Sequence, residues 1–174
     1  MIRKQPTWFL ILVTGIVVAL DQVTKWLVVS RLALYESWAP IPQLDSYVRI
    51  THTNNTGAAF GIFPQGGLIF AIIGVVVSAA IIYYFHQLPP AGWGVRAALS
   101  LQLGGALGNL IDRFRQGLEV TDFIHVMNFP VFNVADSAIT VGVGLLILLM
   151  ILEDRRGKGD NEQPQDVQDE SEMT

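Results

Sequence analysis

Long apolar runs alternate with polar segments along this chain, and four of the runs define its expected architecture: 8–29, 66–85, 92–111 and 134–152. Crossing the hydrocarbon core of a bilayer as a helix takes about 20 mostly apolar residues. The second run is uncharged throughout, and the fourth contains Asp136 as its only charged residue. The pattern predicts an integral membrane protein, mainly α, with four transmembrane helices.

The connection between the first two runs, residues 30–65, is long enough to have structure of its own. Its stretch SYVRITHTNN is rich in β-branched residues, which favours one or two short strands lying at the membrane surface. FPQGG then breaks the chain before the second helix. HQLPPAGWG, after the second helix, suffices only for a turn. We therefore expect a small β cradle between helices 1 and 2.

The composition supports a membrane protein and sets its C-terminus apart. Hydrophobic residues make up 51% of the chain and charged residues 15%, with a mean hydropathy of +0.44. The formal net charge of -4 comes from residues 153–174, which hold eight acidic and three basic residues, so residues 1–152 carry a net +1. A segment this polar cannot build a core. We expect a four-helix membrane domain at 1–156 and a disordered cytoplasmic tail at 157–174.

The distribution of basic residues favours both termini in the cytoplasm. That orientation places six basic residues inside and five outside, a small difference, but the inner ones flank the first and last helices closely. They include Arg3, Lys4, Arg155 and Arg156. A cleaved secretory signal peptide is disfavoured for the first run, because no small-residue cleavage site follows it. The β cradle is then expected on the extracytoplasmic side.

The residue types exclude several chemistries. The chain has no cysteine, which rules out disulfides, thiolate catalysis and cysteine-based metal sites. Its three histidines (His52, His86 and His125) match no metal-binding spacing. We expect no metal, no cofactor and no nucleic-acid partner, and we expect a monomer.

Charged residues near the hydrocarbon are costly and call for a partner or a function. Four of the seven carboxylates outside the tail fall at the outer ends of helices: Asp21, Asp112, Asp122 and Asp136. In DQVTKW, Asp21 and Lys25 stand at i and i+4, which predicts a structural ion pair. In GGALGNLIDR, the glycines allow close helix packing, and Asn109 lies near Asp112 and Arg113.

Asp122 and Asp136 flank the connection between the last two helices, so they meet at the outer membrane edge if those helices are neighbours. Two carboxylates in a poorly solvated site share one proton, as in aspartic proteases. From the residues alone, an ion-conducting or proton-relay site explains the pair equally well, and a non-catalytic scaffold is a third class. A serine mechanism is disfavoured, because Ser137 has no histidine base nearby and no GxSxG occurs.

Five motifs decide between these readings. DQVTK, NNTGAAFG, GGALGNLIDR, VTDF and FNVADSAITVG occur in this order over residues 21–144. Together they resemble the successive motifs of lipoprotein signal peptidase (signal peptidase II). The resemblance implies a bacterial inner-membrane aspartyl endopeptidase. Such an enzyme removes the signal peptide from diacylglyceryl-modified prolipoproteins, cutting just before the lipidated cysteine.

The resemblance also implies roles for individual residues. Asp122 in VTDF and Asp136 in FNVAD match the catalytic pair, and Asp21 and Lys25 match a pair that supports structure. Globomycin-type cyclic peptides are implied as inhibitors, and membrane lipids as partners. The positions that match the substrate groove are Asn54, Gly105, Asn109, Arg113 and Asn133.

Overall fold

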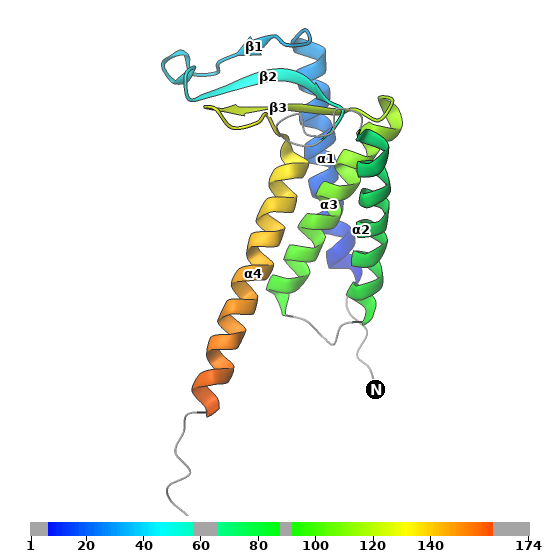
Figure 1. Ribbon diagram of the computed structural model, residues 1–174, viewed down its shortest axis with the longest axis vertical. Helices are drawn as coiled ribbons and strands as arrows, with labels where there is room; N and C mark the ends of the chain where they lie inside the picture. The colour runs from blue at the N-terminus through cyan, green and yellow to red at the C-terminus, as the bar shows by residue number, and fades with distance from the viewer. Residues whose placement is uncertain (1–6, 58–65, 88–91, 162–174) are drawn as a thin grey trace, which may run out of the picture.

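A computed structural model describes residues 7–57, 66–87 and 92–161. Within these residues, four long helices form a bundle whose axes run along the long dimension of the molecule (Figure 1). They are α1 (Thr7–Arg31), α2 (Gly67–Gln87), α3 (Trp93–Arg115) and α4 (Val134–Asn161). Helices α1, α2 and α3 begin and end within four residues of the apolar runs, and α4 begins with the fourth run but continues past its end, so the hydrophobic pattern located all four helices.

Helix α3 is the centre of the bundle, because it packs against α1, α2 and α4. The glycines of α3 allow the backbones of α1 and α4 to lie close to it. A Cβ on Gly104 would lie 2.6 Å from the Cβ of Val17 on α1, and a Cβ on Gly105 would meet the backbone oxygen of Ala135 on α4. Small residues at such crossings let helix backbones pack closely.

Three of the helices are long and apolar enough to cross a membrane: α1, α2 and α4 over Val134–Arg155. Their outward faces carry many exposed large apolar side chains, among them Ile11, Trp26, Val76 and Met150. A soluble monomer rarely exposes so much apolar surface. Helix α3 is not among these three helices, because polar residues such as Arg96, Gln102 and Asn109 interrupt its apolar sequence.

A three-stranded antiparallel sheet lies across one end of the bundle (Figure 1). Its order is β1 (Ser37–Trp38), β2 (Val48–Asn55) and β3 (Val120–Val126), and a short 3-10 helix spans Pro42–Leu44. Thr53 pairs with Asp122, and the register shifts between Ile50 and Thr53.

The placement of the sheet differs from the sequence prediction. The expected cradle lay between helices 1 and 2, but only β1 and β2 come from that connection, and β3 comes from the connection between α3 and α4. The sequence did not predict β3 because Val120 to Phe123 are all buried. A strand buried on both faces lacks the alternation of apolar and polar residues that marks a strand with one exposed face.

The C-terminal part of α4 continues to Asn161, past the predicted boundary at 156. Residues 162–174, most of the predicted tail, lie outside the described residues, as do residues 58–61 of the NNTGAAFG motif.

The interior of the bundle differs between its two ends. Far from the sheet, a small apolar core is formed by Leu10, Ile81, Phe85 and Leu103. Beneath the sheet, buried apolar residues such as Val120 and Phe123 lie beside a large set of buried polar and charged ones: Asp21, Lys25, Asn109, Asp112, Thr121, Asp122 and Asn133.

Candidate active site

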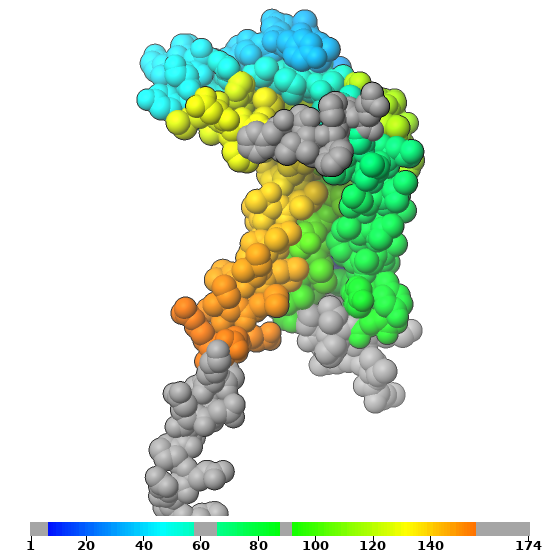
Figure 2. All heavy atoms as spheres, in the orientation of Figure 1, coloured from blue at the N-terminus to red at the C-terminus, as the bar shows by residue number. Residues whose placement is uncertain are grey.

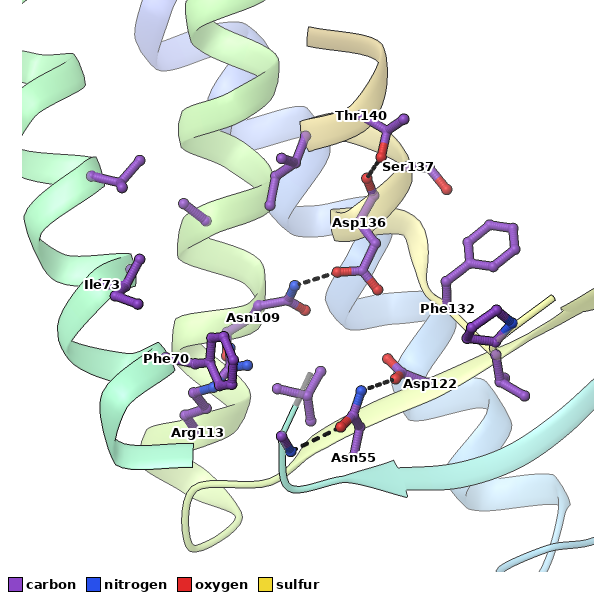
Figure 3. Close-up of a pocket in the computed structure, with 18 of the residues that line it drawn as sticks. Asn55, Phe70, Ile73, Asn109, Arg113, Asp122, Phe132, Asp136, Ser137 and Thr140 are labelled. Carbon is purple, nitrogen blue, oxygen red and sulfur yellow. Dashed lines mark hydrogen bonds between the residues drawn. The ribbon is translucent and has the colours of Figure 1, made fainter. Parts of the chain in front are cut away.

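Asp122 is a buried residue in the middle of β3, and two amides hold its carboxylate. Asn133 donates from Nδ2 to Oδ1 at 2.7 Å. Asn55, at the end of the neighbouring strand β2, donates from Nδ2 to Oδ2 at 2.9 Å (Figure 3). Both oxygens therefore have a fixed orientation.

Asp136 stands in the first turn of α4 and helps to start that helix. The Oδ1 of Asn133 accepts from the Asp136 backbone N–H at 2.9 Å, and the Oδ2 of Asp136 accepts from the Asn133 N–H at 3.2 Å. This reciprocal pair is a capping box. The remaining oxygen, Oδ1, accepts from Asn109 Nδ2 of α3 at 2.7 Å (Figure 3). The helix N-terminus also favours a negative charge at this position.

Asn133 thus links the two aspartates, and it is fully buried. It caps the helix that carries Asp136 and donates to Asp122 from its side chain. The same side-chain nitrogen lies 3.1 Å from the Oδ1 of Asn109, so all four residues belong to one network. The sequence prediction that Asp122 and Asp136 lie close together agrees with this network.

The environment of Asp122 favours its protonated form. Burial, followed by the negative charge of Asp136, raises the pKa of the Asp122 carboxyl to about 7, while the hydrogen bonds from Asn55 and Asn133 act in the opposite direction. Two neighbouring carboxyls that share one proton are the arrangement used for acid–base hydrolysis.

Both aspartates open into a groove of about 800 Å³. Figure 2 shows the hollow between α2 and α4, under the sheet, with α3 at its floor. One end is polar, with Asn55, Asn109 and Arg113 beside the two carboxylates. The other walls are apolar and come from α2, α3, α4 and the segment before α4; they include Ile73, Val77, Ala106, Phe132, Ile139 and Val141.

Arg113 lines this groove, and few of its N–H donors are used by the residues that the structure describes. Its Nη1 donates to the backbone oxygen of Asn109 at 3.3 Å, and its guanidinium lies 5.8 Å from the ring centroid of Phe70. Within the described part of the chain, its buried Nε has no hydrogen-bond partner. An arginine held this way presents a positive charge to the groove.

An ion network lies directly behind the aspartates. Lys25 forms ion pairs with Asp21 at 2.8 Å and with Asp112 at 3.0 Å, and all three are buried. The predicted pair between Asp21 and Lys25 is confirmed. Gln22 adds side-chain contacts to both carboxylates, at 3.2 Å to Asp21 and 2.9 Å to Asp112.

Three residues that the motifs placed in the substrate groove lie behind it: Asn133, Gly105 and Asn54. Gly105 packs against the backbone of Ala135 on α4. Asn54 donates to Glu119 at 2.8 Å, while Asn55, which the sequence analysis did not single out, contacts Asp122. Successive residues of a strand face opposite sides. The two neighbouring asparagines could therefore have indicated that only one of them faces the carboxylate.

Comparisons with known proteins show the family of this chain. Residues 13–152 match the family described as signal peptidase (SPase) II. The lipoprotein signal peptidase of Halalkalibacterium halodurans is 46% identical over 151 residues, which cover 84% of this chain and 94% of that protein. The lipoprotein signal peptidase of Bacillus subtilis is 44% identical over 148 residues, which cover 82% of this chain and 93% of that protein.

Two solved structures, both described as bacterial membrane enzymes, have the same fold. One superposes with a TM-score of 0.79 at 34% identity, covering 97% of this chain and 99% of that chain. The other gives 0.75 at 37% identity, covering 86% and 97%. Because the family match runs from α1 into α4 and includes both aspartates, the chain belongs to the signal peptidase II family, as a multi-pass membrane protease.

Proposed function

We propose that this protein removes signal peptides from prolipoproteins by an aspartic mechanism in which Asp122 and Asp136 share one proton. The observation that carries the proposal is the joint amide network: Asn133 holds both aspartates, and each carboxylate has one further amide donor. Both carboxylates face the same groove. A pair fixed in this way meets the geometric requirement for general acid–base catalysis.

In the first step, the Asp136 carboxylate takes a proton from water while the water oxygen adds to the scissile carbonyl carbon. Asp122, protonated because its pKa is about 7, donates its proton to the carbonyl oxygen. As the tetrahedral intermediate collapses, Asp136 gives the proton it took from water to the leaving amine, and Asp122 takes back a proton from a hydroxyl of the intermediate. Ser137 takes no part, since its hydroxyl donates to the backbone oxygen of Asn133 at 2.9 Å.

The groove supports a lipid-modified substrate, cut just before a diacylglyceryl-modified cysteine. Its apolar walls come largely from the helices themselves, and two of these, α2 and α4, are candidate membrane spans. Acyl chains in the bilayer therefore have an apolar surface that leads to the carboxylates. Globomycin-type cyclic peptides would inhibit by occupying the same groove.

The residues predicted to contact substrate divide into two groups. Asn109 and Arg113 line the groove, where the guanidinium of Arg113 places a positive charge beside the substrate. Asn133, Gly105 and Asn54 act from behind it. Asn133 orients the aspartates, Gly105 allows α4 to approach α3, and Asn54 ties β2 to Glu119 at 2.8 Å.

We propose four transmembrane helices in the bacterial inner membrane, with both termini cytoplasmic and the active site at the extracytoplasmic face. Asp122 lies in β3 and Asp136 in the first turn of α4, which begins beneath the sheet (Figure 1), so one orientation places the sheet and both aspartates together. The proposed working unit is a monomer. Reporter fusions at each terminus test the orientation.

The experiment for the mechanism is turnover of a diacylglyceryl-modified prolipoprotein by purified protein in liposomes. Asp122→Asn and Asp136→Asn should each abolish cleavage, because neither variant can share a proton between two carboxyls. Asp45→Asn, the same change at an exposed position, is the control and should cleave at the wild-type rate. Wild-type turnover by either of the first two variants would refute the aspartic mechanism.

A further inference from the structure

Lys25 lies at the centre of the ion network, and its ammonium is fully engaged. Its three N–H groups have three acceptors: Asp21 Oδ2 at 2.8 Å, Asp112 Oδ2 at 3.0 Å and Asn109 Oδ1 at 3.0 Å. It is only 3% exposed and does not line the groove. Lys25 therefore has no access to substrate and acts through its three partners.

Two of those partners lead to the backbone just before each catalytic aspartate. Asp112 Oδ2 accepts from the N–H of Thr121, the residue preceding Asp122, at 3.2 Å. Asp21 Oδ1 accepts from the N–H of Ala135, the residue preceding Asp136, at 3.0 Å. The ion network thus holds β3 with one carboxylate and the start of α4 with the other.

The third partner leads to the Asp136 carboxylate itself. An ammonium only donates hydrogen bonds, so the Asn109 atom that faces Lys25 must be its oxygen. The amide nitrogen of Asn109 is then turned toward Asp136, to whose Oδ1 it donates at 2.7 Å. The charge of Lys25 therefore fixes which end of the Asn109 amide meets the carboxylate.

We propose that Lys25 is a positioning residue that sets the separation and orientation of the two catalytic aspartates, through Asp112 to the β3 backbone, through Asp21 to the α4 backbone, and through Asn109 to Asp136. This inference rests on the proposed function of Asp122 and Asp136. It goes beyond a supporting ion pair, because it ties Lys25 to the rate of the chemical step. A displacement of about 1 Å costs roughly 10²-fold in rate.

The test compares variants of the full-length protein in liposomes. Lys25→Met removes the charge at similar length, and we expect kcat to fall about 10²-fold with KM nearly unchanged, because the groove keeps its lining. Lys25→Arg keeps the positive charge and the donors and should recover much of the lost kcat. If Lys25→Met keeps wild-type kcat, the inference is wrong.

A second variant covers the case in which Lys25→Met fails to fold. Asp112→Asn leaves the Lys25–Asp21 pair intact but weakens the tie to Thr121, so kcat should fall about tenfold in a folded protein. Thr14→Val is the matched control. Thr14 donates a hydrogen bond to the Ser100 carbonyl at 3.2 Å and so joins α1 to α3, as the Lys25–Asp112 ion pair does. The kcat of Thr14→Val should be unchanged. Equal losses of kcat in Asp112→Asn and Thr14→Val would overturn the inference.

The pH profile supplies a readout that a purely structural role would not move. The charge of Lys25 lowers the pKa of Asp122, against the raising effects of burial and Asp136. Lys25→Met should therefore shift the alkaline limb of kcat/KM to higher pH, and an unshifted limb contradicts the inference. Turnover by Asp122→Asn or Asp136→Asn would refute the aspartic mechanism itself. If those two variants are inactive while the Lys25 and Asp112 variants keep wild-type kcat, only the inference fails.

Discussion

The two ends of the helix bundle are stabilised in different ways. Far from the sheet, Leu10, Ile81, Phe85 and Leu103 pack as apolar side chains, which tolerate changes that conserve volume. Under the sheet, Lys25 and its carboxylate partners are held by directional contacts. A charge left without its partner there stays buried, which costs several kcal/mol. The polar end therefore tolerates fewer substitutions than the apolar end, but its side chains have a fixed geometry. The candidate active site lies at this polar end.

The largest expected contrast is between Asp21→Ala and Phe85→Ala. Asp21→Ala leaves Lys25 short of an acceptor and the Ala135 N–H without its partner, so the protein should lose about 3–5 kcal/mol of stability. Phe85→Ala leaves a cavity and should lose a similar amount. Turnover measured well below the unfolding temperature should fall only in Asp21→Ala. Thermal unfolding in detergent measures the loss of stability in both variants. An equal loss of turnover in both variants would show that the two ends do not differ in this way.

Alanine substitutions at two glycines should change stability by smaller amounts and test the difference between the polar end and the rest of the bundle. A Cβ on Gly108 would lie 2.6 Å from Asp21 Oδ2, whereas a Cβ on Gly15 has nothing within 4 Å. Gly108→Ala should therefore push Asp21 from its place and destabilise the protein by about 1–3 kcal/mol. Gly15→Ala should be neutral or stabilise by up to about 1 kcal/mol, because alanine favours a helix. Thermal unfolding of Gly108→Ala and Gly15→Ala tests this prediction. Equal unfolding temperatures would argue against a tightly packed polar end.

The pH dependence of cleavage should come from the polar end alone. The pKa of Asp122 is raised from 3.8 to about 7, so the folded protein keeps this proton at pH values where the unfolded chain has lost it. Stability from this group therefore falls as pH rises from 3.8 towards 7. The active protonated form also disappears above about pH 7, and kcat/KM should fall by about tenfold per pH unit there. A profile that stays flat to pH 9 would contradict protonated Asp122 as the acid.

The smallest effect is expected at the C-terminus. Truncation after Arg156 removes the predicted tail, and complementation of a strain depleted of its own lipoprotein signal peptidase should remain at the wild-type level. The truncation also removes the last residues of α4, which ends at Asn161, so membrane insertion is checked in parallel. A truncated protein that inserts but fails to process prolipoprotein would show that the tail takes part in function.

The sequence predicted the features that depend on local spacing. Hydrophobic runs located the four helices, and the i, i+4 spacing of Asp21 and Lys25 identified their ion pair, which is 2.8 Å long in the structure. It could not predict that Asp112 would join them from α3, 3.0 Å from Lys25. Partners on different helices meet only through the packing of the bundle, and no short-range pattern records that packing.

Strand β3 shows a second limit. The pairing of Thr53 with Asp122 joins segments that are far apart in sequence, and the buried residues of β3 give no alternating pattern. The motifs identified Asp122 as a candidate but predicted no strand at this position. They also passed over Asn55, whose contact with Asp122 depends on this strand pairing.

The contact between Asp21 and Ala135 has a consequence for the order of synthesis. The two residues are 114 positions apart and join the first helix to the start of the last. Chains are made from the N-terminus, so Asp21 enters the membrane long before its partner exists. The same late segment supplies Asn133 and Asp136. A partly translated chain therefore has no complete pair of aspartates, and under the proposed mechanism it becomes a protease only when the final helix is made.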